Sequence, residues 1–185
     1  MHFIKKSPEV YFTETDIATI SEKELTFLKA AVQETPLKRV RINLHPSNED
    51  SLHEMFIAIQ KGSYIRPHKH PNKSEAFHAV LGSAQIIIFT DDGAIKEVVP
   101  LAAGQPGKPF YYRLSKPYFH TLILESDLLI IHEITNGPFV PGGTLYAPFA
   151  PDGSNPAEVA DFEAQLTKQV NAPVIASAAR QSIYN

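Results

Sequence analysis

Residues 62–82 read GSYIRPHKHPNKSEAFHAVLG, and this stretch carries the pattern that decides the fold. His68 and His70 stand two residues apart, so on a β-strand both imidazole rings project from the same face. The turn at 71–73 reverses the chain, so that Glu75 returns to the same point in space. Two imidazoles and a carboxylate that converge on one face are ligands for a hard-to-borderline divalent metal ion.

A fourth ligand is expected from a later strand. His120, in the stretch YFHTLILE, has the order and the context for this role. The alternative is a set of ordinary structural histidines, which is the better interpretation for one histidine alone. The complete spacing favours metal binding. We therefore predict one divalent transition metal ion per chain (Fe, Mn, Ni, Zn or Co), held by His68, His70, Glu75 and His120.

Composition bounds the class of protein and its partners. The chain has 185 residues and no Cys, which excludes disulfides, thiolate metal sites and a cysteine nucleophile. Its net charge of −3, without a basic block, argues against nucleic acid as a partner. No apolar run is long enough to cross a bilayer, and the N-terminus lacks the apolar stretch of a signal peptide. We therefore expect a cytoplasmic protein without membrane contact.

The central part of the sequence predicts a mainly β fold. Short segments rich in Ile, Val, Phe and Tyr follow one another without a helical crossover, which favours an antiparallel sandwich or barrel. The expected strands are 37–44, 54–61, 64–70, 75–82, 84–90, 94–101, 109–114, 118–125 and 128–135. The residues Asp-Asp-Gly at 91–93 predict a hairpin turn between two of them.

Two helices are expected at the sides of this β block. A capping box that starts at Ser21 begins the first helix, and Pro36 stops it. Asn155, followed by a proline, caps the second. The length allows one domain. Its predicted parts are an N-terminal extension over 1–36 with a helix at about 22–35, a barrel over 37–136, and a Pro/Gly-rich arm over 137–185 with a helix at about 156–170.

The spacing in 62–82 resembles the first motif of the cupin superfamily, G-x5-H-x-H-x4-E-x6-G. Its fixed positions are filled by Gly62, His68, His70, Glu75 and Gly82. The second motif, G-x5-P-x-G-x2-H-x3-N, is partly present. His120 occupies its ligand position, whereas its Pro, Gly and Asn positions hold Ser115, Pro117 and Leu124.

A narrower resemblance covers residues 37–153. The stretches KRVRINLHPS, HEITNGPF and APFAP, together with the first motif, look like the WbuC-family cupin-fold metalloproteins. This resemblance implies a single RmlC-like jelly-roll β-barrel with a mononuclear metal bound by three His and one Glu. Many members of the family occur in surface-polysaccharide contexts. Cupins are commonly homodimers that exchange strands or arms, and the apolar arm of this chain fits such an assembly.

Strand alternation extends the predicted metal site into a pocket. If the metal ligands face the barrel interior, a further set of side chains faces it too. This set is Tyr64, Arg66, Phe77, Ala79, Leu81, Tyr118, Leu122 and Leu124. The cavity is therefore expected to be mostly apolar, as small-molecule sites usually are. Arg66 is the candidate contact for an anion, and a surface salt bridge is an equally good interpretation of it.

A second polar face follows the strand 37–44. It consists of Arg39, Arg41, Asn43 and His45. A solvated strand face explains the pattern, and a pocket mouth that binds an anion explains it equally well. Further along, His132 and Glu133 are adjacent, so only one of them faces the cavity. A buried Glu133 would need a partner, and Arg39 or Arg41 could supply one.

Three functions are compatible with these residues. The first is a metal-dependent enzyme of the dioxygenase, isomerase or lyase type, acting on a small polar, anionic or sugar-derived molecule. The second is a non-catalytic module that binds or senses a ligand through the metal. The third is a scaffold with a structural metal. Four protein ligands close a tetrahedral site, but they leave one or two open positions on a five- or six-coordinate ion.

Overall fold

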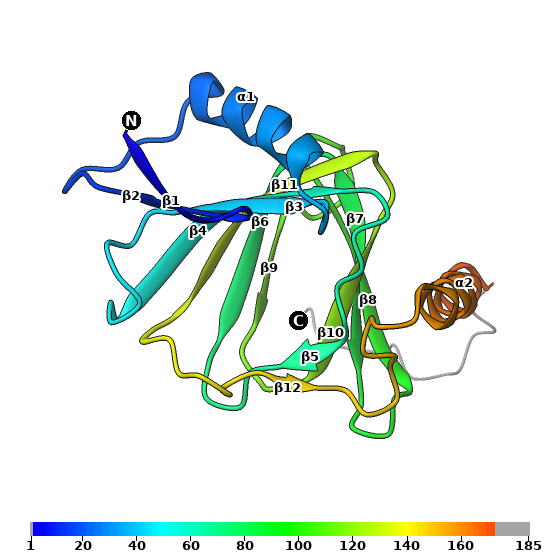
Figure 1. The fold of residues 1–185 in the computed structure, drawn as a ribbon. Coiled ribbons are helices and arrows are strands. Elements are labelled where there is room, and N and C mark those ends of the chain that lie inside the picture. Colours follow the sequence, from blue (N-terminus) through cyan, green and yellow to red (C-terminus); the bar gives the residue numbers. More distant parts are fainter. Residues whose placement is uncertain (1, 173–185) are drawn as a thin grey trace, which may run out of the picture.

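The computed structural model describes residues 2–172 and consists of two β-sheets that face each other across a common interior (Figure 1). One sheet has seven strands in the order β1-β2-β3-β4-β11-β6-β9, and the other has five in the order β12-β5-β10-β7-β8. Helix α1 lies across the outer face of the first sheet, and helix α2 lies outside the second (Figure 1). The mainly β fold predicted from the sequence is confirmed.

The elements have the following bounds. The strands of the larger sheet are β1 (Phe3–Ser7), β2 (Val10–Thr13), β3 (Arg39–Asn43), β4 (Leu52–Gln60), β6 (Glu75–Leu81), β9 (Tyr111–Leu114) and β11 (Leu128–Asn136). Those of the smaller sheet are β5 (His68–Lys69), β7 (Ser83–Phe89), β8 (Ile95–Ala102), β10 (Phe119–Leu124) and β12 (Leu145–Tyr146). The helices are α1 (Glu22–Ala31), a 3-10 turn (Val32–Glu34) and α2 (Pro156–Asn171).

Each of the nine segments expected to be strands overlaps an observed strand. The largest shortfall is in 64–70, where only His68–Lys69 pairs as a strand. Pro67 explains the difference, because proline has no N–H to donate to a ladder. Its carbonyl still accepts a hydrogen bond from the Ala147 N–H at 2.8 Å, which joins this segment to the C-terminal arm.

Strands β1 and β2 were not expected from the sequence. They form an antiparallel pair, and β2 then pairs in parallel with β3, in contrast to the antiparallel pairing expected throughout. Two consecutive lysines in β1 hide the apolar alternation by which a strand is recognised. The start of the predicted N-terminal extension is therefore part of the larger sheet.

Helix α1 begins at the predicted capping box. The Ser21 backbone N–H donates to a Glu24 carboxylate oxygen at 3.0 Å, and the Ser21 hydroxyl accepts from the Lys23 N–H at 3.3 Å. The α-helix ends at Ala31 and continues as a 3-10 turn, a common way for a helix to tighten before a proline. Leu28 is fully buried against the outer face of β3 and β4.

Helix α2 packs on the smaller sheet. The Asn155 side chain accepts a hydrogen bond from the Ala157 N–H at 3.0 Å, as expected for its cap. Leu166 is buried among apolar side chains of β7, β10 and the arm. The predicted arm extends to residue 185, and its part over 173–185 lies outside the described residues. In the part of the chain that is described, no helix combines the length and apolar character that a membrane crossing requires.

The inner face of the larger sheet can be read as rows of paired residues. Asn43 pairs with Met55, Met55 with Glu133, and Glu133 with Phe77. Beside this row, His53 pairs with Thr135 and Thr135 with Glu75. Apolar side chains from both sheets fill the remaining interior. The polar inward residues therefore gather near one end of the barrel.

Leu81 does not follow the expected alternation. The register between β6 and β11 shifts so that Ile130 faces Leu81 while Ile131 faces Ala79, and Leu81 packs on the side of α1. The chain then turns at Gly82, whose φ is +78°. A Cβ there would lie 2.1 Å from the Leu128 carbonyl oxygen, so only glycine fits this corner of the motif.

Candidate metal centre

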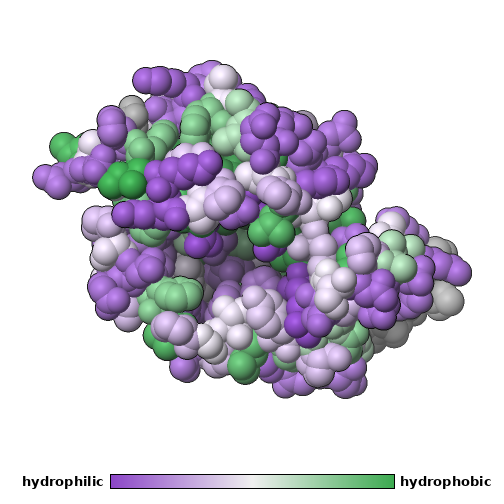
Figure 2. Space-filling model, in the orientation of Figure 1, coloured by the Kyte–Doolittle hydropathy of each residue, from purple (hydrophilic) through white to green (hydrophobic). Residues whose placement is uncertain are grey.

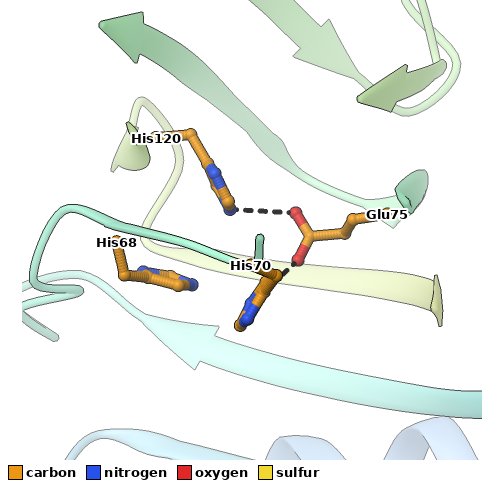
Figure 3. A group of neighbouring side chains, drawn as sticks. All are labelled: His68, His70, Glu75 and His120. Carbon is orange, nitrogen blue, oxygen red and sulfur yellow. Dashed lines mark ion pairs between the residues drawn. The ribbon is translucent and has the colours of Figure 1, made fainter. Parts of the chain in front are cut away.

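The four side chains predicted as metal ligands lie together inside the barrel (Figure 3). His68 on β5 and His120 on β10 are directly paired across the smaller sheet. His70 follows β5, and Glu75 begins β6 on the opposite sheet. Each residue offers one nitrogen or oxygen atom, and these atoms all lie within 4.8 Å of one another. Both sheets therefore contribute to the cluster, which the local sequence pattern predicts.

Hydrogen bonds hold the imidazole rings from behind. His68 Nδ1 donates to the Arg66 carbonyl oxygen at 2.9 Å, and His120 Nδ1 donates to the Tyr118 carbonyl oxygen at 3.0 Å. A carbonyl oxygen only accepts, so each of these Nδ1 atoms carries the hydrogen. The neutral ring then has its lone pair on Nε2, as in metal-ligating histidines that donate through the other nitrogen.

His70 is held in a different way. Its Nδ1 lies 3.2 Å from the Thr144 hydroxyl, which belongs to the arm and can either donate or accept. Its Nε2 lies 3.7 Å from Glu75 Oε2. The ring is therefore fixed between the arm and the carboxylate, with Nε2 directed toward the centre of the cluster (Figure 3).

Glu75 lies between two of the histidines. Its Oε1 is 3.0 Å from His120 Nε2, and it also accepts a 3.4 Å hydrogen bond from the Tyr112 hydroxyl on β9. Only 4% of Glu75 is exposed. A carboxylate this deep in the protein needs hydrogen-bond donors or positive charge around it, and the cluster provides both.

Burial and charge act in opposite directions on these groups. Burial lowers the pKa of His68 to about 4 and also lowers that of His70. Burial would raise the pKa of Glu75, but the neighbouring histidines, His120 foremost, bring it below the ordinary value. The Glu75 carboxylate raises the pKa of His120 against the effect of burial. The cluster is therefore an ionised carboxylate among rings of which His120 most readily holds a proton.

The arrangement fits a bound cation. His120 Nε2 is buried without a hydrogen-bond partner and lies 3.0 Å from a carboxylate oxygen. In the neutral ring both atoms present lone pairs to each other, which is repulsive unless a proton or metal ion lies between them. Three imidazole nitrogens and one carboxylate oxygen are a donor set that divalent transition metals accept. The four residues therefore fit such an ion.

A small cavity of about 10 Å³ adjoins the cluster. That is about the space a single water molecule needs. It is lined by His70, Lys73, Glu75, Leu114, Lys116, Pro117, Tyr118 and His120. Of the predicted pocket residues, Tyr118 thus lies next to the cluster. Phe77 lies in the apolar core, edge-on to the Tyr112 ring at 5.2 Å.

Two predicted pocket residues have partners elsewhere. The Tyr64 hydroxyl donates to the Pro151 carbonyl oxygen at 2.8 Å, so its polar end faces the arm. The His45 ring is stacked on His53 with 4.1 Å between ring centroids, and its Nδ1 lies 3.0 Å from the Glu54 carbonyl oxygen. The structure does not bring these two side chains into the metal cluster.

None of the remaining predicted pocket residues belongs to the cluster of four side chains. Arg39, Arg41 and Asn43 are on the side of β3 opposite the helix-covered core residues Val40 and Ile42. Arg66 precedes the ligand strand β5. Glu133 is partly buried, and burial together with the charge of Glu75 raises its pKa to about 8. Of the expected partners, Arg41 interacts with Glu133 electrostatically.

Several side chains at the site were not predicted from the sequence. Tyr112 could have been found, because alternation from Leu114 places it on the inward face of β9. Thr144 and Tyr146 lie in an irregular arm whose path carries no periodic signal. His53 lies just before the expected strand 54–61, whereas the structure includes it in β4 with 5% exposure.

Comparison with known proteins gives independent support for the fold. The model of a family described as a domain of unknown function, DUF6016, matches residues 20–101. The search of curated proteins finds no match. Protein SO0799 of Shewanella oneidensis is 12% identical, with a TM-score of 0.52 over 69% of this chain and 84% of that chain.

A second solved structure carries the fold name in its description. It is an uncharacterised Klebsiella pneumoniae protein with a double-stranded β-helix domain, 16% identical, with a TM-score of 0.50 over 73% of this chain and 95% of that chain. At these identities the likeness concerns the fold alone. The strand order, the two facing sheets and these likenesses agree. The chain has the double-stranded β-helix, or jelly-roll, fold.

Proposed function

We propose that this protein binds one divalent transition metal ion at His68, His70, Glu75 and His120 and uses it to act on a small polar or anionic molecule. The observation that carries the proposal is the convergence of three imidazoles on one carboxylate inside the barrel. The Nδ1 atoms of His68 and His120 are occupied by backbone carbonyls, which leaves Nε2 as the ligand atom.

The chemistry follows from what the chain supplies around the ion. A divalent ion bound there supplies Lewis-acid or redox chemistry, according to its identity. The Tyr112 hydroxyl holds one carboxylate oxygen of Glu75 and orients it. The apolar core beside the cluster excludes bulk water from the ligand side chains. The small cavity between Lys116 and His120 supports an approach for one further ligand of water size.

In more detail, we propose that the protein is an enzyme of the dioxygenase, isomerase or lyase type. Its substrate would be a sugar-derived molecule of surface-polysaccharide metabolism, and it would act in the cytoplasm. This proposal is supported by the resemblance of 37–153 to the WbuC family. The cavity beside the cluster favours it over a purely structural metal. A homodimer is proposed with it, supported by Phe139, Val140 and Leu145 of the arm, which are about half exposed. Solution mass at micromolar concentration tests the dimer.

Metal content tests the proposal directly. The full chain is stripped with a chelator, and each candidate ion is titrated against a chromophoric competitor. We expect one ion per chain, and loss of that binding in His120→Ala. The matched control is His78→Ala, because His78 is exposed on the outer side of β6 and touches Phe110 instead of the cluster. Absence of stoichiometric binding in the unaltered protein would overturn the proposal.

Catalysis needs its own measurement. Metal-loaded protein is incubated with candidate polar and anionic substrates, and turnover is compared with that of His70→Ala. Water exchange at the ion, measured by nuclear relaxation of solvent protons with Mn²⁺ bound, separates an accessible centre from a closed structural one. An ion without exchangeable water would contradict the enzyme and leave a structural scaffold.

A further inference from the structure

Three arginines on β3 and just before β5 form no direct ion pair, although Arg41 interacts electrostatically with Glu133. Arg39 and Arg41 are on β3, and Arg66 is two residues before the ligand His68. Within residues 2–172, none of the three takes part in an ion pair. Guanidinium groups that are held close to one another and have no carboxylate in direct contact can bind an anion.

The Arg66 side chain is held by an aromatic contact, but one of its hydrogen-bond donors has no acceptor. Its guanidinium carbon lies 4.9 Å from the centre of the Tyr146 ring, and its Nε is buried without a hydrogen-bond partner. The Tyr146 ring is in turn 6.3 Å from the ring of His68. Arg66 is therefore connected, through one aromatic ring, to the candidate metal centre.

Arg39 approaches the same segment from the other sheet. Its Nη1 donates to the Tyr64 carbonyl oxygen at 3.3 Å, which leaves its other N–H groups without a side-chain acceptor among the described residues. Burial lowers the pKa of Arg39, and the charge of Arg41 acts in the same direction. Two cations placed this close repel each other, and an anion between them would relieve the repulsion.

Asn43 adds an acceptor to the same face. It is 2% exposed, and its Oδ1 has no hydrogen-bond partner. It stands two residues from Arg41 on β3 and therefore projects to the same side. A buried, unpaired amide oxygen calls for an O–H or N–H donor. This interior face thus offers donors for an anion and an acceptor for a hydroxyl.

Figure 2 shows a hollow between the larger sheet and the segment of β5 and β12, with hydrophilic side chains within it. In the row of paired residues, Asn43 is followed by the apolar Met55 and then by Glu133, so a second polar side chain lies on the same inner face. A ligand in the hollow would lie between β3, which carries Arg39 and Arg41, and the segment of β5, which Arg66 precedes.

We propose that Arg39, Arg41, Asn43 and Arg66, called the arginine face below, bind a small hydroxylated organic anion. Its carboxylate or phosphate lies against the guanidinium groups, and a hydroxyl donates to Asn43. This inference deepens the proposed function, on which it rests for the role of the ligand's other end. It assigns the substrate class as sugar acids, hydroxy acids or sugar phosphates, and excludes neutral sugars.

Calorimetric titration of the full chain tests this, in the stripped and the Co²⁺-loaded form. The compounds are D-gluconate, glucose 6-phosphate, the neutral polyol sorbitol and propionate, an anion without hydroxyls. We expect gluconate or glucose 6-phosphate to bind at least about tenfold more tightly than sorbitol and propionate. The preferred member of the pair identifies a carboxylate or a phosphate as the natural anion.

Variants locate the site. Arg66→Gln is expected to weaken binding of the preferred anion by about tenfold or more, and Arg66→Lys by less, because lysine keeps the charge but not the planar fork. Arg41→Gln, at an exposed position that tolerates the change, provides a second variant should Arg66→Gln not fold. Arg113→Gln removes an arginine on the outward side of β9 and is expected to change nothing.

The outcomes separate this inference from the proposed function. If the chain binds Co²⁺ stoichiometrically but binds anions and sorbitol equally well, the arginine face is overturned and the metal centre stands. The same conclusion follows if the arginine variants bind anions as tightly as the unaltered protein. Arginine-dependent anion binding by a chain that does not take up Co²⁺ would support the arginine face and overturn the proposed function. A change of the visible Co²⁺ spectrum on anion binding, lost in Arg66→Gln, supports both.

Discussion

Two groups of largely buried histidines lie in this barrel, and their comparison shows what distinguishes a candidate metal ligand from a packed imidazole. In the cluster of His68, His70 and His120, ring nitrogens converge with the Glu75 carboxylate. In the pair, the rings of His45 and His53 are stacked 4.1 Å apart at an interplanar angle of 4°. Both groups are largely buried, so they differ in the direction in which their ring nitrogens point.

The backbone contacts of the two groups explain the difference. In the cluster, backbone carbonyl oxygens accept hydrogen bonds from Nδ1 of His68 and His120. The Nε2 atoms of these two rings are directed toward the centre of the cluster. In the pair, His53 Nε2 donates to the Asn48 carbonyl oxygen at 3.2 Å, and His45 Nδ1 contacts the backbone of Glu54. No carboxylate lies between these two rings. Their nitrogens thus serve local backbone structure, and their faces pack on each other.

The largest expected effect is a loss of metal affinity when one histidine of the cluster is removed and the stacked histidine pair is left intact. His120→Ala should lower the affinity for a divalent ion by about two orders of magnitude or more, because it removes one of four ligands. His45→Ala should leave the affinity unchanged. Competition titration with a chromophoric chelator measures both. Equal losses in the two variants would mean that histidine content, and not convergence on Glu75, determines metal binding.

For folding stability we expect the opposite: removal of a histidine from the stacked pair should cost more than removal of one from the cluster. His53→Ala is expected to lower the free energy of unfolding by about 2–4 kcal/mol, because it leaves a cavity beside His45 in a packed site. His70→Ala should cost less in the stripped protein, because His70 is only partly buried and the change removes no close-packed ring stack. Urea unfolding in the presence of a chelator gives both values. A stripped protein that is destabilised more by His70→Ala would contradict this ranking.

Side chains behind the ligands should have an intermediate effect. Thr144→Val removes the hydroxyl next to His70 Nδ1, and Tyr112→Phe removes the donor to Glu75. Each should lower metal affinity by about tenfold, as changes behind metal ligands typically do. The matched control is Thr90→Val, because that hydroxyl contacts Asp92 in an exposed hairpin turn. Affinities equal to that of the control would show that these contacts do not orient the ligands.

The smallest expected effect concerns Glu133, a partly buried acid outside both groups. Burial raises the pKa of Glu133 to about 8, above the 4.5 of an ordinary glutamate. A raised pKa means that the folded state holds the proton more firmly. The contribution to stability is therefore complete below pH 4.5 and is lost as the pH rises through 8.

Glu133→Gln should flatten this part of the pH dependence of the stripped protein. Thermal unfolding between pH 5 and pH 8.5 measures it, with Glu97→Gln, an exposed position on β8, as the control. If the two variants show the same pH profile as the unaltered chain, Glu133 is ionised in the folded protein throughout this range.

The ligands could be predicted from the sequence because their spacing is local. His68, His70 and Glu75 lie within eight residues of one strand and turn, and alternation alone orients them. His120 needed one further assumption, that a later strand returns to the same place, and its pairing with His68 confirms that assumption.

The supporting side chains depend on pairings that single-sequence patterns do not contain. Thr144 reaches His70 from an irregular arm, and Tyr146 lies in a two-residue strand that forms only because β5 is beside it. The direction of Leu81 depends on a register shift, which reverses alternation without any change in composition. The two lysines of β1 concealed a strand that the sheet nevertheless includes.

The most direct test of the account is the position of the metal itself. A crystal of the Zn²⁺- or Co²⁺-loaded protein, with anomalous diffraction recorded at the metal edge, locates each ion without reference to the fold. We predict one anomalous peak per chain, within about 2.0–2.2 Å of Nε2 of His68, His70 and His120 and of a Glu75 carboxylate oxygen. A peak at His45 and His53, or none at the cluster, would contradict the account.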